Sequence, residues 1–136
     1  MTGVRKFEDL EAWTSAREFT NMIYGVTRQG PFARDFGLRD QIRRSSISIL
    51  SNIAEGFESR TDMQFISYLG HARASAGEAR AQLYIALDQQ YVTSAQFAES
   101  LAAVQRCSRQ IYNLMRYLER NPRRNRGSGQ ATPTRA

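Results

Sequence analysis

The chain has 136 residues, a length that fits a single domain with one hydrophobic core. Its single cysteine excludes an intramolecular disulfide, so a reducing compartment is expected. Its formal net charge of +6 permits an anionic partner without identifying one. The sequence has no apolar run of ~20 residues, as a membrane span needs, and Met1 to Lys6 lead into acidic residues rather than a signal-peptide core, so we expect a cytoplasmic protein that does not bind a membrane.

The first helix is predicted over about residues 9–28, with Asp9 as its N-cap. A broad apolar arc supports it, formed by Ala12, Trp13, Ala16, Phe19, Ile23 and Val26. Gly30-Pro31 is expected to stop the helix, because glycine suits the position after a helix end and proline cannot continue one. Residues 32–36 are then a short connection.

The second helix, about residues 37–56, carries two apolar faces. One is a core stripe formed by Leu38, Ile42, Ser46, Ile49 and Ile53. The other is a strip formed by Ile47, Leu50, Ala54 and Phe57. Gly56 is predicted to end this helix. The serines inside it keep the surface thin, so that another helix can approach closely.

The third helix, about residues 62–89, begins at the capping box Thr61-x-x-Gln64. Its core seam consists of Phe65, Leu69, Ala72, Ala76, Ala79, Leu83 and Leu87. A small-residue strip lies almost opposite this seam and consists of Gly70, Ala74, Gly77 and Ala81. Because glycine inside a helix costs about 0.8–1 kcal/mol relative to alanine, we interpret this strip as a packing face rather than as a solvent face that happens to be small.

The fourth helix, about residues 94–119, begins at a second capping box, Thr93-x-x-Gln96, and ends before Pro122. Its predicted core stripe consists of Phe97, Leu101, Val104, Ser108, Ile111, Met115 and Leu118. Residues 121–136 lack periodicity and acidic residues, and are expected to form a basic disordered tail.

These four helices predict an all-α domain over residues 1–120, folded as an antiparallel up-down-up-down four-helix bundle. The second faces of the two middle helices predict that copies assemble side by side into a homo-oligomer. The expected interface residues are Ile47, Leu50, Ala54, Gly70, Ala74, Gly77 and Ala81.

The strongest functional signal is the Arg stripe of the fourth helix, which consists of Arg106, Arg109, Arg116 and Arg120. It contains no acidic residue and leads into Arg123, Arg124 and Arg126 of the tail. Guanidinium groups suit phosphate, so one interpretation is sequence-tolerant binding of RNA or DNA backbone. The alternative is that these arginines pair with acids on a neighbouring subunit. Tyr112 and Tyr117 are expected to flank the core more than the stripe.

No catalytic constellation is evident, and we expect a protein that is not an enzyme and has no metal or cofactor. His71 is the only histidine and is read as a polar residue on a helix flank. Cys107 is read as a partly buried structural residue. Glu55 and Glu78 are expected to be partly buried in structural ion pairs within or between subunits, with partners such as Arg43, Arg44 or Arg80.

The run from Arg43 to Gly56 resembles the signature helix of the 23S rRNA intervening-sequence protein family, small bacterial proteins described as four helix bundle proteins. The resemblance covers about residues 7–118. Its motif residues here are Arg44, Ser48, Ser51, Asn52, Glu55, Gly56 and Glu78. At Leu50 the family usually carries proline, which leaves open whether this helix has a kink.

The resemblance implies a homopentameric barrel in a family whose function is poorly characterised. The family is also similar to the accessory protein of diversity-generating retroelements, which partners a reverse transcriptase. The resemblance therefore implies a second functional hypothesis besides nucleic-acid binding, namely that the protein is a protein-interaction scaffold or accessory subunit.

Overall fold

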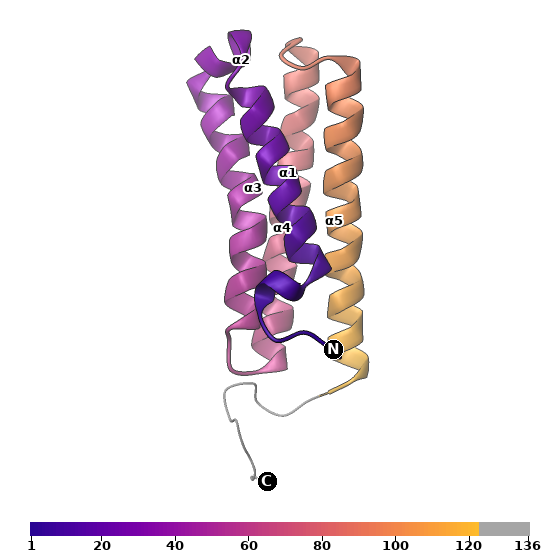
Figure 1. Cartoon of the computed structure of the whole chain (residues 1–136). Coiled ribbons are helices and arrows are strands. Elements are labelled where there is room, and N and C mark those ends of the chain that lie inside the picture. Colours follow the sequence, from indigo (N-terminus) through magenta and orange to yellow (C-terminus); the bar gives the residue numbers. More distant parts are fainter. Residues whose placement is uncertain (123–136) are drawn as a thin grey trace.

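The computed structural model describes residues 1–122, and every regular element in this range is a helix. The elements are the 3-10 helix η1 (Phe7–Asp9) and the α-helices α1 (Glu11–Thr27), α2 (Gly30–Arg34), α3 (Phe36–Phe57), α4 (Asp62–Asp88) and α5 (Ser94–Arg120). The four long helices lie side by side, with consecutive ones joined at alternating ends (Figure 1). The predicted all-helical fold with four long helices is confirmed. No described helix has the length and apolar character that crossing a membrane requires. Residues 123–136, most of the predicted tail, lie outside the described range.

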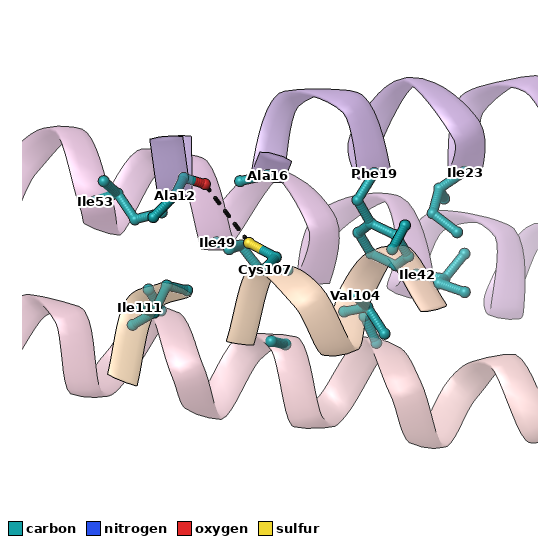
Figure 2. Close-up of a cluster of buried hydrophobic side chains, with 14 of the residues drawn as sticks. Ala12, Ala16, Phe19, Ile23, Ile42, Ile49, Ile53, Val104, Cys107 and Ile111 are labelled. Carbon is teal, nitrogen blue, oxygen red and sulfur yellow. Dashed lines mark hydrogen bonds between the residues drawn. The ribbon is translucent and has the colours of Figure 1, made fainter. Parts of the chain in front are cut away.

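The hydrophobic core lies along the axis between the four long helices. Helices α1 and α4 each pack against both α3 and α5, so neighbours in sequence are also neighbours in space. The largest fully buried side chains include Phe19, Ile23, Ile42, Ile49, Ile53, Val104 and Ile111, which are labelled in Figure 2. Phe65, Leu69, Leu83 and Leu118 are also fully buried. Burial of one such side chain stabilises the fold by about 1.5–3 kcal/mol. The predicted seam of α4 is confirmed from Phe65 to Leu83, while Leu87 is half-buried.

Both predicted capping boxes are confirmed. The backbone N–H of Gln64 donates to Thr61 Oγ1 at 3.1 Å, and the Thr61 N–H donates to Gln64 Oε1 at 3.2 Å. In α5 the corresponding distances between Thr93 and Gln96 are 3.0 and 2.9 Å. Each box therefore satisfies two backbone N–H groups at a helix start that would otherwise lack a partner.

The start of α1 differs from the prediction. Leu10, not Asp9, is the N-cap, and it supplies no side-chain cap. Asp9 instead ends η1, and its carboxylate accepts hydrogen bonds from the backbone N–H groups of Arg5 at 2.9 Å and Lys6 at 3.3 Å. The bond from Arg5 is the main reason that the pKa of Asp9 lies below its usual value. Asp9 therefore orders the chain before the helix.

The segment after α1 was also predicted wrongly. Helix α1 ends at Thr27, and Gly30-Pro31 starts the short helix α2 rather than only stopping the previous one. Proline is favoured in a first turn because no hydrogen bond within the helix needs its missing N–H. The side chain of Phe32 is fully buried and stacks on Tyr91 with ring centroids 5.1 Å apart. Helix α2 therefore covers one end of the core.

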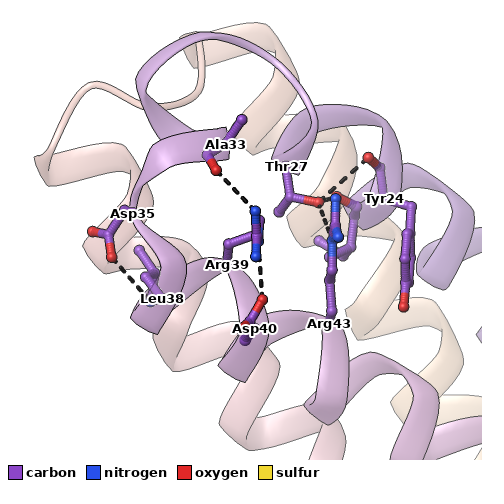
Figure 3. Close-up of polar contacts among 9 residues, drawn as sticks. Tyr24, Thr27, Ala33, Asp35, Leu38, Arg39, Asp40 and Arg43 are labelled. Carbon is purple, nitrogen blue, oxygen red and sulfur yellow. Dashed lines mark hydrogen bonds and ion pairs between the residues drawn. The ribbon is translucent and has the colours of Figure 1, made fainter.

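Asp35 links two parts of this end of the bundle. Its Oδ1 accepts a hydrogen bond from the Leu38 N–H at 3.1 Å and so caps α3 (Figure 3). Its Oδ2 accepts from the Tyr91 hydroxyl at 2.9 Å, which raises the pKa of Tyr91. The start of α3 is thereby tied to the connection between α4 and α5.

Arginines tie α3 to the segments before it (Figure 3). Arg39 Nη1 donates to the carbonyl of Ala33 at 3.0 Å. Arg43 Nε donates to Thr27 Oγ1 at 2.8 Å, and its guanidinium lies 4.5 Å from the ring centroid of Tyr24. These contacts join α1, α2 and α3 at one corner.

Three serines of α3, Ser45, Ser46 and Ser48, are hydrogen-bonded. Ser46 donates to the carbonyl of Arg43 at 2.8 Å. The hydroxyls of Ser48 and Ser75 share a hydrogen bond of 2.8 Å between α3 and α4. Helix α3 continues through Leu50 to Phe57. The prediction that Gly56 ends the helix is wrong, because Gly56 lies within α3 and is buried against α4.

The buried face of α5 is rotated slightly from the predicted stripe. Cys107 is fully buried, whereas Ser108 is only half-buried, and the buried set also includes Ser100 and Ala103. The Cys107 thiol donates a weak hydrogen bond to the carbonyl of Ala12 at 3.6 Å (Figure 2). Burial raises the pKa of Cys107 to about 12. Cys107 was expected to be a partly buried structural residue. Its burial agrees with a structural role, but the burial is complete rather than partial.

Candidate nucleic-acid interface

The Arg stripe lies on the outside of α5. Arg106, Arg109 and Arg120 are exposed, and Arg116 is half-buried. The core residues Val104, Cys107, Ile111 and Leu118 occupy other positions around the same helix. The stripe is therefore accessible over four turns of α5 in the single chain.

Two arginines of the stripe have acidic neighbours that the predicted all-basic face did not include. Arg106 lies 3.7 Å from Glu18 of α1, and Arg116 lies 3.7 Å from Glu119. Both pairs are solvent-exposed, and such pairs contribute between zero and about 1 kcal/mol. Arg109 and Arg120 take part in no ion pair within residues 1–122. These weak pairs leave the guanidinium groups free to exchange partners.

Tyr112 contacts the Arg stripe and is more exposed than the sequence predicts. Its side chain is 39% exposed, and its hydroxyl accepts a hydrogen bond from Arg116 Nη1 at 3.0 Å. This bond raises the pKa of the Arg116 guanidinium. Arg73 of α4 lies over the same ring, with its Cζ 4.7 Å from the centroid. Tyr112 therefore joins arginines of two helices.

Tyr117 differs from Tyr112 and agrees with the prediction that it flanks the core. It is half-buried and packs against the hydrophobic cluster. Its hydroxyl accepts a hydrogen bond from the amino group of Met1 at 2.5 Å. This contact holds the first residues of the chain against the C-terminal part of α5.

A shallow hollow of about 380 Å³ lies at the C-terminal end of α5. Its lining residues are Tyr112, Asn113, Arg116, Tyr117, Arg120 and Asn121. The lining thus combines aromatic rings, amides and guanidinium groups, and it includes no carboxylate. These groups suit an anionic ligand that also has a flat ring.

A second groove, of about 400 Å³, lies between α4 and α5. The α4 side combines small residues, Gly70, Ala74 and Gly77, with the two arginines Arg73 and Arg80. Neither arginine is part of the basic surface that the sequence predicts. Their seven-residue spacing puts both arginines on one face of α4. This spacing is visible in the sequence and would have predicted that they share a surface.

The predicted oligomer-interface residues are accessible in the single chain. Ile47 is 40% exposed, Leu50, Ala54 and Gly70 are half-buried, and Ala74, Gly77 and Ala81 are exposed. A Cβ atom on Gly77 would have no atom within 4 Å. The fold of the single chain therefore does not require glycine at this position.

The motif residues of α3 and α4 fall into two groups. Ser48, Ser51 and Asn52 are half-buried, and Asn52 Nδ2 donates to the carbonyl of Ser48 at 2.8 Å. Arg44, Glu55 and Glu78 are exposed. The expected partial burial of Glu55 and Glu78 is therefore wrong for the single chain. No ion pair within residues 1–122 joins either carboxylate to an arginine, and pairing between subunits stays a prediction.

Other candidate chemistry finds little support in the described range. His71 is exposed on α4, as expected for a polar residue on a helix flank. Within residues 1–122 no group of three or more His, Cys, Asp or Glu side chains is arranged to hold a metal ion. Cys107 is buried, and its raised pKa keeps it in the unreactive thiol form. Arg123, Arg124 and Arg126 of the predicted binding surface lie outside the described residues.

Among solved structures, the chain is similar to a protein of unknown function from the S23 ribosomal protein family of Bacteroides thetaiotaomicron. The sequences are 20% identical and the TM-score is 0.72, with 78% of this chain and 96% of the other covered. At this identity the similarity supports the fold alone. No curated protein matches the chain significantly.

The family comparison covers most of the same region. The model of the 23S rRNA-intervening sequence protein family matches residues 8–113, which include all of α1 to α4 and most of α5. The match agrees with the resemblance that was carried by the run from Arg43 to Gly56. This protein therefore belongs to the 23S rRNA-intervening sequence protein family.

Proposed function

We propose that this protein is a non-enzymatic, cytoplasmic four-helix bundle that binds the phosphate backbone of RNA or DNA through its Arg stripe. The main supporting observation is the outer face of α5, where Arg109 and Arg120 are exposed and lack an ion pair within residues 1–122. Arg106 and Arg116 have only long, exposed contacts with carboxylates. Phosphate groups can replace such contacts, because guanidinium binds phosphate through paired hydrogen bonds.

Assembly is part of this proposal. We infer that antiparallel up-down-up-down bundles associate side by side into a homo-oligomer, with a pentamer implied by the family resemblance. An oligomer repeats the Arg stripe and the basic tail residues Arg123, Arg124 and Arg126 around one surface. Linked copies bind at high effective concentration, so few phosphate contacts per chain suffice.

Fluorescence anisotropy with labelled RNA and DNA at low and near-physiological salt tests the proposal. Binding should tolerate changes of sequence and weaken steeply with salt, with a log–log slope of about −0.9 per neutralised phosphate on duplex DNA. Arg109→Glu combined with Arg116→Glu should weaken binding strongly, and truncation after Asn121 should weaken it and reduce the slope. The matched control is Arg34→Glu in α2 with Arg60→Glu in the connection between α3 and α4, an equal charge change at exposed positions away from α5. Absence of binding at low salt, or equal losses in both double variants, contradicts the proposal.

A protein-interaction scaffold or accessory subunit, for example for a reverse transcriptase, is the second candidate. The exposed side chain of Ile47 on α3 and the exposed Ala74, Gly77 and Ala81 on α4 favour it. Such surfaces suit close approach of another helix. A reverse-transcriptase gene beside this one, together with co-purification of the two proteins through this face, would favour the scaffold over nucleic-acid binding.

A further inference from the structure

The ring of Tyr112 brings together two positive charges from different helices. Arg73 of α4 lies over the ring with its Cζ 4.7 Å from the centroid, and Arg116 of α5 donates to the hydroxyl at 3.0 Å. Arg73 forms no ion pair within residues 1–122, and Arg116 has only the 3.7 Å contact with Glu119. Holding two guanidinium groups near each other is electrostatically unfavourable, and a bound anion relieves this repulsion.

The surroundings of Tyr112 suit more than a phosphate group. The adjoining hollow of about 380 Å³ is lined by Tyr112, Tyr117, Asn113 and Asn121, besides two arginines. This volume is within the range of sites for small molecules. Phosphate contacts need only the guanidinium groups, whereas rings and amides provide stacking and hydrogen bonds for a base. In a duplex the bases stack on each other, so only an unpaired base can use these groups.

We propose that the hollow at the C-terminal end of α5 binds an unpaired nucleotide of single-stranded RNA or DNA. The base stacks at Tyr112, and the adjacent phosphates bind Arg116 and Arg120, which line the hollow, and Arg73, which lines the neighbouring groove and lies over the Tyr112 ring. This inference rests on the proposed nucleic-acid binding and specifies its preferred ligand as single-stranded. It also assigns binding roles to Arg73 and Tyr112, which lie outside the Arg stripe.

The test compares a fluorescein-labelled single strand of roughly 12 nucleotides, within the length that one binding module covers, with a duplex of the same length. The full chain is used at fixed low salt. Tyr112→Leu should weaken single-strand binding by about ten-fold or more, the effect expected from losing one stacked base. Duplex binding should change by no more than about two-fold, as for an ordinary surface substitution. Tyr112→Phe keeps the ring and should retain most of the single-strand affinity.

Two matched controls separate the site from general effects. Tyr84 is 44% exposed on α4, close to the 39% of Tyr112, and Tyr84→Leu should leave single-strand binding unchanged. Arg17 lies over Trp13 at 5.8 Å from the ring centroid, so Arg17→Gln is the control for Arg73→Gln. Arg73→Gln should weaken single-strand binding. It should also reduce the magnitude of the slope of log binding constant against log salt concentration by about one for each site. Circular dichroism checks that each variant is folded.

Photocrosslinking of the unmodified protein to a 5-bromouracil-substituted single strand needs no variant. A crosslink at Tyr112 supports the site, and crosslinks only elsewhere overturn it. Equal weakening of single-strand and duplex binding by Tyr112→Leu, or no weakening, also overturns this inference, although backbone binding by the Arg stripe then stands. If the unmodified protein binds neither probe, both proposals fail.

Discussion

The backbone of Gly56 in α3 lies directly against the side chain of Phe65 in α4. A Cβ atom on Gly56 would lie 2.8 Å from Cδ1 of Phe65 and 2.8 Å from the Cβ of Tyr68. Distances this short require a neighbouring group to move. Glycine is therefore needed here because of contact between two helices, and not because the chain turns.

Gly56→Ala should destabilise the bundle by about 1–3 kcal/mol, the usual cost of an added group in a closely packed core. Urea unfolding measures the change. The control is Gly25→Ala within α1, where an added Cβ has no atom within 4 Å. It should stabilise the fold by about 0.5–1 kcal/mol, because alanine favours helix more than glycine does. Equal stability of both variants would contradict the close contact.

The capping box at the start of α5 should contribute measurably to stability. Thr93→Ala removes the oxygen that accepts from the Gln96 N–H at 3.0 Å and should cost about 1 kcal/mol. Thr93→Ser keeps this oxygen and should retain most of the stability. Thermal unfolding followed by circular dichroism compares the variants, and a loss as large in the serine variant as in the alanine variant would argue against capping.

Cys107 should make stability depend on pH in the alkaline range. Burial raises its pKa from 9.0 to about 12, so the folded state disfavours the thiolate. Its contribution to stability is fully present below about pH 9, and it is lost as pH rises through the folded pKa near 12. Tyr91, whose pKa is also raised in the fold, loses stability in the same alkaline range, so urea unfolding at several pH values should show a larger loss for the unmodified protein than for Cys107→Ala. At pH 8, iodoacetamide should alkylate Cys107 only after unfolding, and rapid alkylation of the folded protein would contradict its burial.

Gly77→Leu should disrupt assembly without unfolding the chain. No atom lies within 4 Å of an added Cβ at Gly77, so the bundle itself tolerates a side chain there. At a helix contact between subunits, the added side chain should cost about 1–3 kcal/mol. Light scattering measures the molecular mass. Ala98→Leu, at another exposed helix position, is the control. A monomeric unmodified protein at micromolar concentration, or an unchanged mass for Gly77→Leu, would contradict this interface.

Features determined by neighbouring residues along the chain were predictable from the sequence. The capping boxes at Thr61 and Thr93 involve residues three positions apart, and the seam of α4 repeats with the helical period. Local rules also produced the errors. Gly30-Pro31 was read as a stop, although proline equally favours a helix start, and the burial of Phe32 determines which role applies here.

The candidate site depended on contacts between helices, which spacing along one helix does not determine. The exposure of Arg109 and Arg120 followed from the α5 pattern alone. The contact of Arg73 with Tyr112 joins residues of different helices and became visible only in the fold. The same limit explains why Gly56 was read as a helix end, since its neighbour Phe65 belongs to α4.

The two oxygens of Asp35 have a consequence for how this end of the bundle opens. One oxygen holds the first turn of α3 and the other holds Tyr91, 56 residues away. When the Asp35 side chain moves away, it releases both the first turn of α3 and the segment around Tyr91. These two segments should therefore belong to one cooperative unit of local unfolding. In native-state hydrogen exchange, the amide of Leu38 and the amides around Tyr91 should then share one opening free energy, although no backbone hydrogen bond within the described range joins the two segments.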